Sequence, residues 1–166
     1  IIYNIWKDDA KETRKRNRKT VEAFYKKGLE LTGLAHKKGV KILAGTDSYD
    51  PYSFPGFSLH DELNELVKAG LSPAESIATA TINPSEYFEV SSDYGTLEKG
   101  KVADIILLNK NPLIDIKNTT SIESIFFNGS IYNRNELHGL LDYVEQNVSG
   151  FKGISITMKI FFKIMK

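Results

Sequence analysis

The 166-residue sequence contains no cysteine, which excludes a disulfide framework and any thiolate chemistry. Histidine is scarce, with three residues in the whole chain. No apolar stretch approaches the roughly 20 residues that a membrane-spanning helix needs, so we expect no membrane span. What remains, 41% hydrophobic and 26% charged residues, is typical of a globular protein with a core of ordinary size.

The chain begins at Ile1 and shows no signal-peptide pattern of a charged region followed by an apolar one. We expect either that a leader has been removed or that the sequence starts inside a longer gene. The lack of cysteine favours a reducing, cytoplasmic location, whereas an upstream leader would favour secretion or the periplasm.

Positive charge is concentrated at the start of the chain. Residues 1–41 carry 12 basic and 5 acidic groups, whereas residues 42–150 carry 6 basic and 16 acidic groups. The run KETRKRNRK (11–19) would suit a nucleic-acid partner or the solvated face of a helix. We favour the helix face and expect no nucleic acid, because the chain has no RNA-binding signature and no aromatic residues interleaved with the basic ones.

The first half of the chain has an α/β pattern. Apolar residues at three- and four-residue steps predict one helix over 8–38, and VKILAG (40–45) predicts a short strand buried on both faces. Ser58, with Asp61 three positions later, predicts the capped start of a second helix, and SPAE (72–75) that of a third, which Asn83-Pro84 would end. The apolar stripe of the first helix comprises Val21, Phe24, Gly28, Leu31 and Ala35.

The second half has an antiparallel β pattern. We expect a strand over 102–108 and a hairpin over 122–132 that turns at Asn128-Gly129, a pair that tolerates positive φ at both positions. A helix is predicted over 135–146. The tail, 151–166, fits either a strand or a helix, and no internal repeat is present.

One carboxylate follows the predicted buried strand directly. Asp47 comes after Gly45 and Thr46, and in parallel α/β folds ligands and catalytic groups lie at the carboxyl ends of strands. The alternative is an Asp that caps a turn or pairs with a buried amide. Position alone leaves both roles open.

Four segments in the same order resemble the C-terminal part of metal-dependent amidohydrolases, in particular imidazolonepropionase-like and prolidase-like enzymes. They are GVKILAGTDS, LHDELNELVKAGLSPAESIATATINPSEYF, GTLEKGKVADIILLNKNPLIDI and IFFNGSIYNR. The resemblance implies the end of a (β/α)8 TIM barrel followed by part of a small composite β-sandwich. Residues 1–91 would then be the barrel portion, 92–134 sandwich strands, and 135–166 a C-terminal helix and tail.

The resemblance also implies a role for Asp47 as a metal ligand that accepts a proton from the metal-bound water. The expected cofactor is one or two divalent ions, with zinc the expected metal, and the substrate a small amide, dipeptide or cyclic amide. The family's His-x-His pair has no match in this chain, so we expect the remainder of the same barrel as a partner and no activity from the segment alone. The sequence leaves oligomerisation open.

Further site residues come from the same comparison. Tyr49, Tyr52 and Phe54 lie on the loop after Asp47 and are candidates for substrate contact, as is His60; the alternative for all four is structural packing. Thr46 and Ser48 flank Asp47 as candidates to orient its carboxylate. We interpret His36, His138 and Asp104 as structural or surface residues.

A second hypothesis is a non-catalytic interaction module derived from an amidohydrolase. Under either hypothesis, a lone strand and half of a sandwich leave apolar surface uncovered, so we expect the isolated chain to be poorly behaved.

Overall fold

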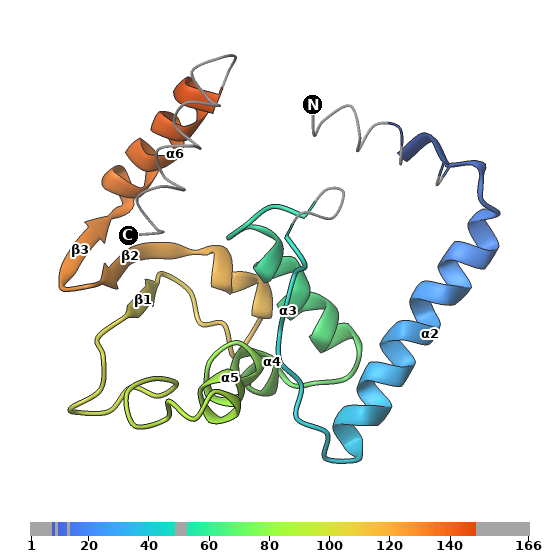
Figure 1. The fold of residues 1–166 in the computed structure, drawn as a ribbon, viewed down its shortest axis with the longest axis horizontal. Helices are drawn as coiled ribbons and strands as arrows, with labels where there is room; N and C mark the ends of the chain where they lie inside the picture. The colour runs from blue at the N-terminus through green and yellow to red at the C-terminus, as the bar shows by residue number, and fades with distance from the viewer. Residues whose placement is uncertain (1–7, 9, 13, 49–52, 149–166) are drawn as a thin grey trace. The chain divides into compact units, whose positions relative to one another are not determined.

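The computed structural model describes residues 8, 10–12, 14–48 and 53–148. The chain folds as two compact units, one of Ile1–Val102 with Lys110–Ser121 and the other of Ala103–Asn109 with Ile122–Lys166. Helices dominate the first unit and a three-stranded sheet the second (Figure 1). The elements, in order, are α2 (Arg18–Lys37), α3 (Ser58–Lys68), α4 (Pro73–Thr79), α5 (Ile82–Tyr87), β1 (Ile105–Leu108), the 3-10 helix η1 (Ile116–Thr120), β2 (Ile122–Phe127), β3 (Ser130–Asn133) and α6 (Arg134–Val148).

The predicted single helix over 8–38 is wrong, because the chain bends before α2 begins. Residues 8, 10–12, 14 and 15 are helical, but Arg16 and Asn17 are not. Asn17 has an extended backbone, and its side chain accepts a hydrogen bond from the Lys19 amide at 3.0 Å. An Asn that caps in this way starts a new helix, since it satisfies an amide that has no partner within the helix.

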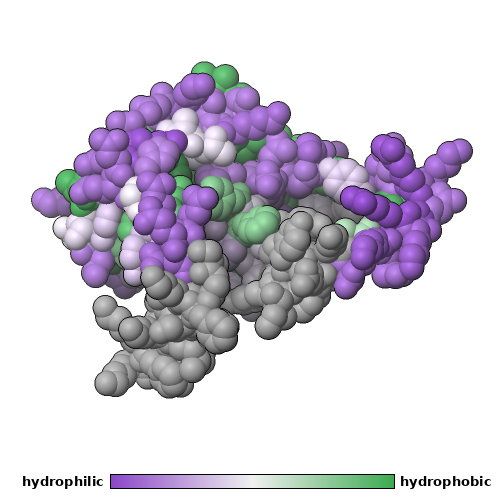
Figure 2. All heavy atoms as spheres, turned by 90° about the horizontal axis from the view of Figure 1, so that it is seen from above, coloured by the Kyte–Doolittle hydropathy of each residue, from purple (hydrophilic) through white to green (hydrophobic). Residues whose placement is uncertain are grey.

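The face of α2 that packs differs from the predicted stripe. Gly33 is the buried residue of α2, and a Cβ built on it would lie 2.0 Å from the Ala69 carbonyl oxygen. The two backbones therefore approach so closely that only glycine fits between them. The predicted stripe is largely uncovered, with Phe24 81% and Leu31 54% exposed. Figure 2 shows apolar side chains at the surface of the molecule beside polar ones.

The core of the first unit lies where α3, α4 and η1 meet. Its apolar residues are Leu63, Leu66, Leu71 and Ile116, each at most 5% exposed. The buried hydroxyl of Ser76 donates to the Leu63 carbonyl at 2.7 Å. Among the described residues, every buried side-chain nitrogen and oxygen has a hydrogen-bond partner, so burial of polar groups carries no unmet desolvation cost there.

One of the two predicted helix caps is confirmed. Before α4, the Ser72 side chain accepts from the Glu75 amide and the Glu75 side chain accepts from the Ser72 amide, which makes a complete capping box with Pro73 in the first turn. The predicted cap at Ser58 is wrong. Ser58 is already helical, and its hydroxyl accepts from the Phe54 amide at 2.8 Å, so it closes the preceding turn instead.

The prediction that Asn83-Pro84 ends a helix is wrong. Both residues lie within α5, and the break between helices comes earlier, at Ala80 and Thr81. Proline is tolerated there because the first amides of a helix have no intrahelical acceptor. The Asn83 side chain reaches back to the predicted strand, where its amide donates to the Ile42 carbonyl at 2.8 Å.

The buried strand predicted over 40–45 is not formed within the described residues. Residues 40–48, the 40–48 segment from here on, are not paired with any described strand. The backbone is instead held by the bond from Asn83 and by the Ala44 amide, which donates to the Thr79 carbonyl at 3.0 Å. Without strands on its edges, the segment exposes Val40 and Leu43.

The second unit is an antiparallel sheet in the order β1-β2-β3. The predicted hairpin is confirmed: β2 pairs with β3, and Asn128 and Gly129 have φ of 48° and 75°. The strand predicted over 102–108 is shorter, starting at Ile105. Asp104 accepts from the amide of Asn128 in the hairpin turn at 3.1 Å, which supports its structural interpretation.

The helix predicted over 135–146 is α6, which begins one residue earlier and ends two residues later. The predicted tail over 151–166 lies outside the described residues. Of the helices in the described ranges, none combines the length and apolar character needed to cross a membrane.

Candidate functional site

Asp47 ends the 40–48 segment in a strained backbone conformation. Its φ is 47°, in the left-handed region, and its side chain is exposed. For a residue other than glycine this conformation costs on the order of 1 kcal/mol, although Asp tolerates it better than most. No hydrogen bond or ion pair joins the Asp47 carboxylate to any part of the chain that the structure describes. Strain of this kind persists only where neighbouring bonds hold it, and it is concentrated at functional sites.

Three hydroxyl groups surround the Asp47 backbone. The side-chain oxygens of Thr46 and Ser48, the residues on either side, lie 2.6 Å apart and share a hydrogen bond. From the far side of the loop, the Ser53 hydroxyl donates to the Thr46 carbonyl at 2.8 Å. The sequence indicates the two flanking residues but not Ser53, because the partner of Ser53 lies seven positions earlier and no local pattern links the two.

Glu62 on α3 is a second carboxylate near this end of the segment, and sequence analysis missed it as well. Partial burial raises its pKa above the ordinary value of 4.5, while a backbone hydrogen bond from Gly45 acts in the opposite direction and the nearby Glu65 adds a smaller increase. Because Glu62 follows a predicted helix start, the sequence indicates only a solvated helix residue and not a partly buried one.

His60, on the first turn of α3, lies against η1. Its Nδ1 is 3.0 Å from the Thr119 hydroxyl oxygen. Burial lowers the pKa of His60, partly offset by the negative charge of Asp61. The imidazole therefore links α3 to η1, and the predicted substrate contact of His60 stays a prediction.

The aromatic residues of the loop are only partly described. Phe54 is 48% exposed, and its amide donates to Ser58. Tyr49 and Tyr52 lie outside the described residues, so their predicted substrate contacts stay predictions.

A complete metal site is not formed by the described residues. They contain no group of three or more His, Asp or Glu side chains that could hold a metal ion. A catalytic zinc site takes three protein ligands and an open position, and Asp47 supplies one at most. The donor set present is therefore too small for the metal that the resemblance implies.

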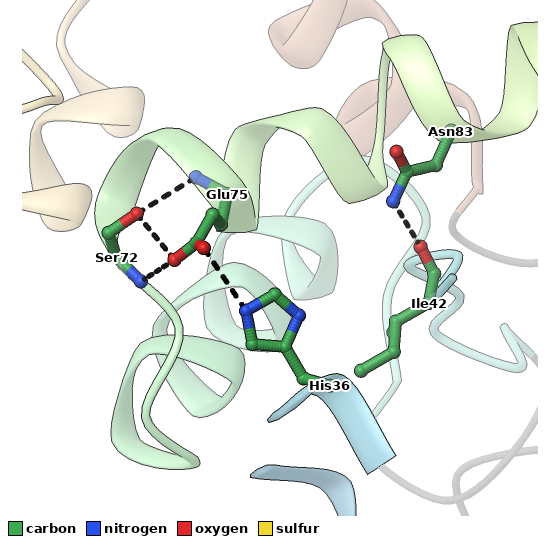
Figure 3. A network of polar contacts seen from close by, with 5 residues as sticks. All are labelled: His36, Ile42, Ser72, Glu75 and Asn83. Atoms are coloured by element: carbon green, nitrogen blue, oxygen red, sulfur yellow. Dashed lines mark hydrogen bonds and ion pairs between the residues drawn. The ribbon is translucent and has the colours of Figure 1, made fainter. Parts of the chain in front are cut away.

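A pocket of about 230 Å³ lies at the opposite, amino end of the segment, lined by residues that include His36, Val40, Glu75 and Asn83. Figure 3 shows two separate sets of bonds there: Glu75 is bonded to His36 and to Ser72, and Asn83 is bonded to the Ile42 carbonyl. His36 Nε2 lies 3.2 Å from Glu75 Oε1, and Glu75 Oε2 accepts from the Ser72 amide and hydroxyl, both at 2.7 Å. These bonds, those from Ser72 first, lower the pKa of Glu75. The arrangement is a helix cap with an attached imidazole, and it supports the structural interpretation of His36.

Comparison with known proteins places these features in a family. The profile of the amidohydrolase family matches residues 6–133, more than half of the chain. The chain belongs to the amidohydrolase family. The match covers the 40–48 segment, the helices that hold it and the three-stranded sheet.

Individual relatives agree with this family. The chain is 33% identical over 72 residues to the imidazolonepropionase of Symbiobacterium thermophilum, a match that covers 43% of this chain and 17% of that protein. It is 32% identical over 90 residues to the adenine deaminase of Rubrobacter xylanophilus, covering 54% of this chain and 14% of that protein. The chain thus spans less than a fifth of the length of these two relatives.

A solved structure supports the fold. The crystal structure of a Xaa-Pro dipeptidase with bound methionine in the active site is similar over 63% of this chain and 25% of that one, with 27% identity and a TM-score of 0.58. The likeness to imidazolonepropionases and to dipeptidases is therefore confirmed. Structures of this family imply a TIM-barrel-type fold, and the described residues form a mixed helix and strand part of it.

Proposed function

We propose that this chain is the C-terminal segment of a metal-dependent hydrolase that cleaves C–N bonds, with Asp47 as metal ligand and proton acceptor. The observation that carries the proposal is an exposed carboxylate in a strained, left-handed conformation, held by hydroxyls at the carboxyl end of an extended apolar segment. Family membership supports it, because ligand and catalytic groups of barrel enzymes lie at the carboxyl ends of the strands.

The 40–48 segment would then be the last strand of a (β/α)8 barrel. No strand among the described residues pairs with the segment, and Val40 and Leu43 are exposed; both observations support this assignment, because a barrel strand pairs on both edges and is covered on both faces. The three-stranded sheet would be part of a composite β-sandwich. Residues 1–91 would form the barrel portion, 92–134 the sandwich strands and 135–166 the C-terminal helix and tail.

The chemistry follows from the carboxylate. A divalent ion, zinc in our proposal, lowers the pKa of a bound water toward neutrality, which supplies a nucleophile at neutral pH. Asp47 would be one of the residues that hold the ion, and its carboxylate would accept a proton from the attacking water and return it to the departing nitrogen. Thr46 and Ser48 would orient the backbone, and the loop with Tyr49, Tyr52 and Phe54, together with His60, would contact a small amide, dipeptide or cyclic amide.

The segment by itself would be inactive, because one ligand does not hold a catalytic metal. The experiment uses a complete gene product that contains this chain. Metal content is measured, and hydrolysis of dipeptides, cyclic amides and aminopurines is assayed before and after chelation. We expect activity that chelation removes and added zinc restores, with loss of both metal and activity in Asp47→Asn. Hydrolysis that survives in Asp47→Asn would refute the role of Asp47.

A second candidate, the non-catalytic interaction module, is favoured by one observation. The exposed apolar face of α2, with Phe24 at 81% and Leu31 at 54% exposure, is a surface that another polypeptide would cover. Translation of the DNA upstream of Ile1 separates the two candidates. An apolar strand that ends in His-x-His supports the enzyme, whereas a stop codon followed by a start codon near Ile1 supports the module.

A further inference from the structure

We propose that Ser53 is the positioning residue of Asp47: its hydroxyl holds the peptide that joins Thr46 to Asp47 and so fixes the direction of the carboxylate. The inference rests on the proposed function, and it adds a residue that neither the sequence pattern nor the family resemblance identified.

The bond from Ser53 acts on Asp47 through the peptide bond that joins Thr46 to Asp47. The Thr46 carbonyl, which accepts from Ser53 Oγ at 2.8 Å, and the Asp47 amide belong to one rigid plane. Rotation of that plane relative to the Asp47 side chain is the φ angle of Asp47. A bond to the Thr46 carbonyl therefore restrains the angle that has the strained value of 47°.

The hydroxyls on either side of Asp47 are hydrogen-bonded to each other, with Thr46 Oγ1 and Ser48 Oγ 2.6 Å apart. This bond spans Asp47 from one flank to the other and keeps the two adjacent residues together. Ser53 and this pair act on different parts of the turn, one on the backbone before Asp47 and the other on the side chains around it.

The chain just before Thr46 is anchored as well. The Asn83 side-chain amide donates to the Ile42 carbonyl at 2.8 Å, and the Ala44 amide donates to the Thr79 carbonyl at 3.0 Å. The bond from Ser53 therefore acts on a backbone that is already held on its other side. Groups that orient a metal ligand in this way affect metal affinity as well as turnover.

The test compares variants of a complete gene product that contains this chain. Zinc affinity is measured by competition with a chelator, turnover by steady-state kinetics and folding by the urea midpoint. We expect Ser53→Ala to raise the zinc Kd about 10-fold and to lower kcat to a similar extent, with KM within about two-fold. Ser53→Thr, which keeps the hydroxyl, restores both.

A matched control is Thr81→Ala, which removes a hydroxyl that donates to the Ile77 carbonyl at 2.9 Å in the α4–α5 region. It should retain the wild-type Kd and kcat. An unchanged zinc Kd in Ser53→Ala overturns the proposal. So does a lowered urea midpoint without rescue by Ser53→Thr, since that result shows a turn-closing role only.

The same measurements separate this inference from the proposed function. If Asp47→Asn binds zinc as well as the wild type, the metal role of Asp47 fails and the positioning role fails with it. If Asp47→Asn loses zinc while Ser53→Ala binds normally, the proposed function stands and only the role of Ser53 is refuted.

Discussion

Polar and acidic side chains lie near both ends of the 40–48 segment, but those near one end stabilise the fold and those near the other end destabilise it. At the amino end, His36, Glu75 and Ser72 are bonded to one another and complete a helix cap, so each polar group contributes to stability (Figure 3). At the carboxyl end, Asp47 is left-handed and the partly buried Glu62 has a raised pKa, so both residues cost stability.

The pocket and the site that we propose lie at opposite ends of the 40–48 segment. The pocket of about 230 Å³ lies at the amino end, yet its polar groups have partners within the chain. Barrel enzymes use the carboxyl ends of strands for chemistry, whereas the opposite face serves stability. Backbone strain and a costly carboxylate are better evidence for a site here than the presence of a pocket.

The largest effect should come from exchanging one residue at each end for its uncharged counterpart. Asp47→Asn keeps a side chain that tolerates the left-handed backbone but removes the proton acceptor, so kcat/KM should fall about 10³-fold. His36→Gln should leave kcat/KM within about two-fold. Steady-state kinetics on a complete gene product checks both, and equal losses from the two variants would abolish the distinction between the ends.

Gly33→Ala in α2 should lower the free energy of unfolding by about 1–3 kcal/mol. The new methyl group meets the Ala69 carbonyl, so α2 must move away from α3. Gly28→Ala on the same helix is the control: its methyl group meets nothing within 4 Å, so it should stabilise by about 0.5–1 kcal/mol. Urea unfolding measures both. Equal stability of the two variants would contradict the close approach of the helices.

The cap of α4 should contribute less. Ser72→Ala removes the acceptor of the Glu75 amide, so the free energy of unfolding should fall by about 1 kcal/mol. The residual activity per folded molecule should not change, because the cap lies at the amino end. A lower kcat per folded molecule in Ser72→Ala would show that the amino end of the 40–48 segment also takes part in function.

The smallest effect is a pH dependence at Glu62. Burial raises its folded pKa, so the folded state holds the proton more tightly than the unfolded chain, and stability is lost as pH rises from about 4.5 through the folded pKa. Glu62→Gln mimics the protonated form and should escape this loss.

The measurement is the urea midpoint of Glu62→Gln minus that of the wild type between pH 4 and pH 7. We expect a difference near zero at pH 4 that grows in favour of the variant toward pH 7. A difference that stays constant over this range would show that Glu62 ionises with equal ease in the folded and unfolded chains.

Sequence alone was sufficient where the deciding partners are a few residues apart. Ser72 and Glu75 form the predicted capping box, and Asn128-Gly129 turns the predicted hairpin. The order of its motifs also identified the family. These features depend on local backbone preferences and on spacing, which a single sequence contains.

Tertiary structure alone decided the rest. The packing face of α2 depends on a contact between Gly33 and Ala69, and the bond from Ser53 to the Thr46 carbonyl joins residues seven positions apart. The 40–48 segment has the pattern of a buried strand, but pairing requires neighbours that the described residues do not supply. Contacts between residues distant in sequence are set by how the whole chain packs, and no local pattern specifies them.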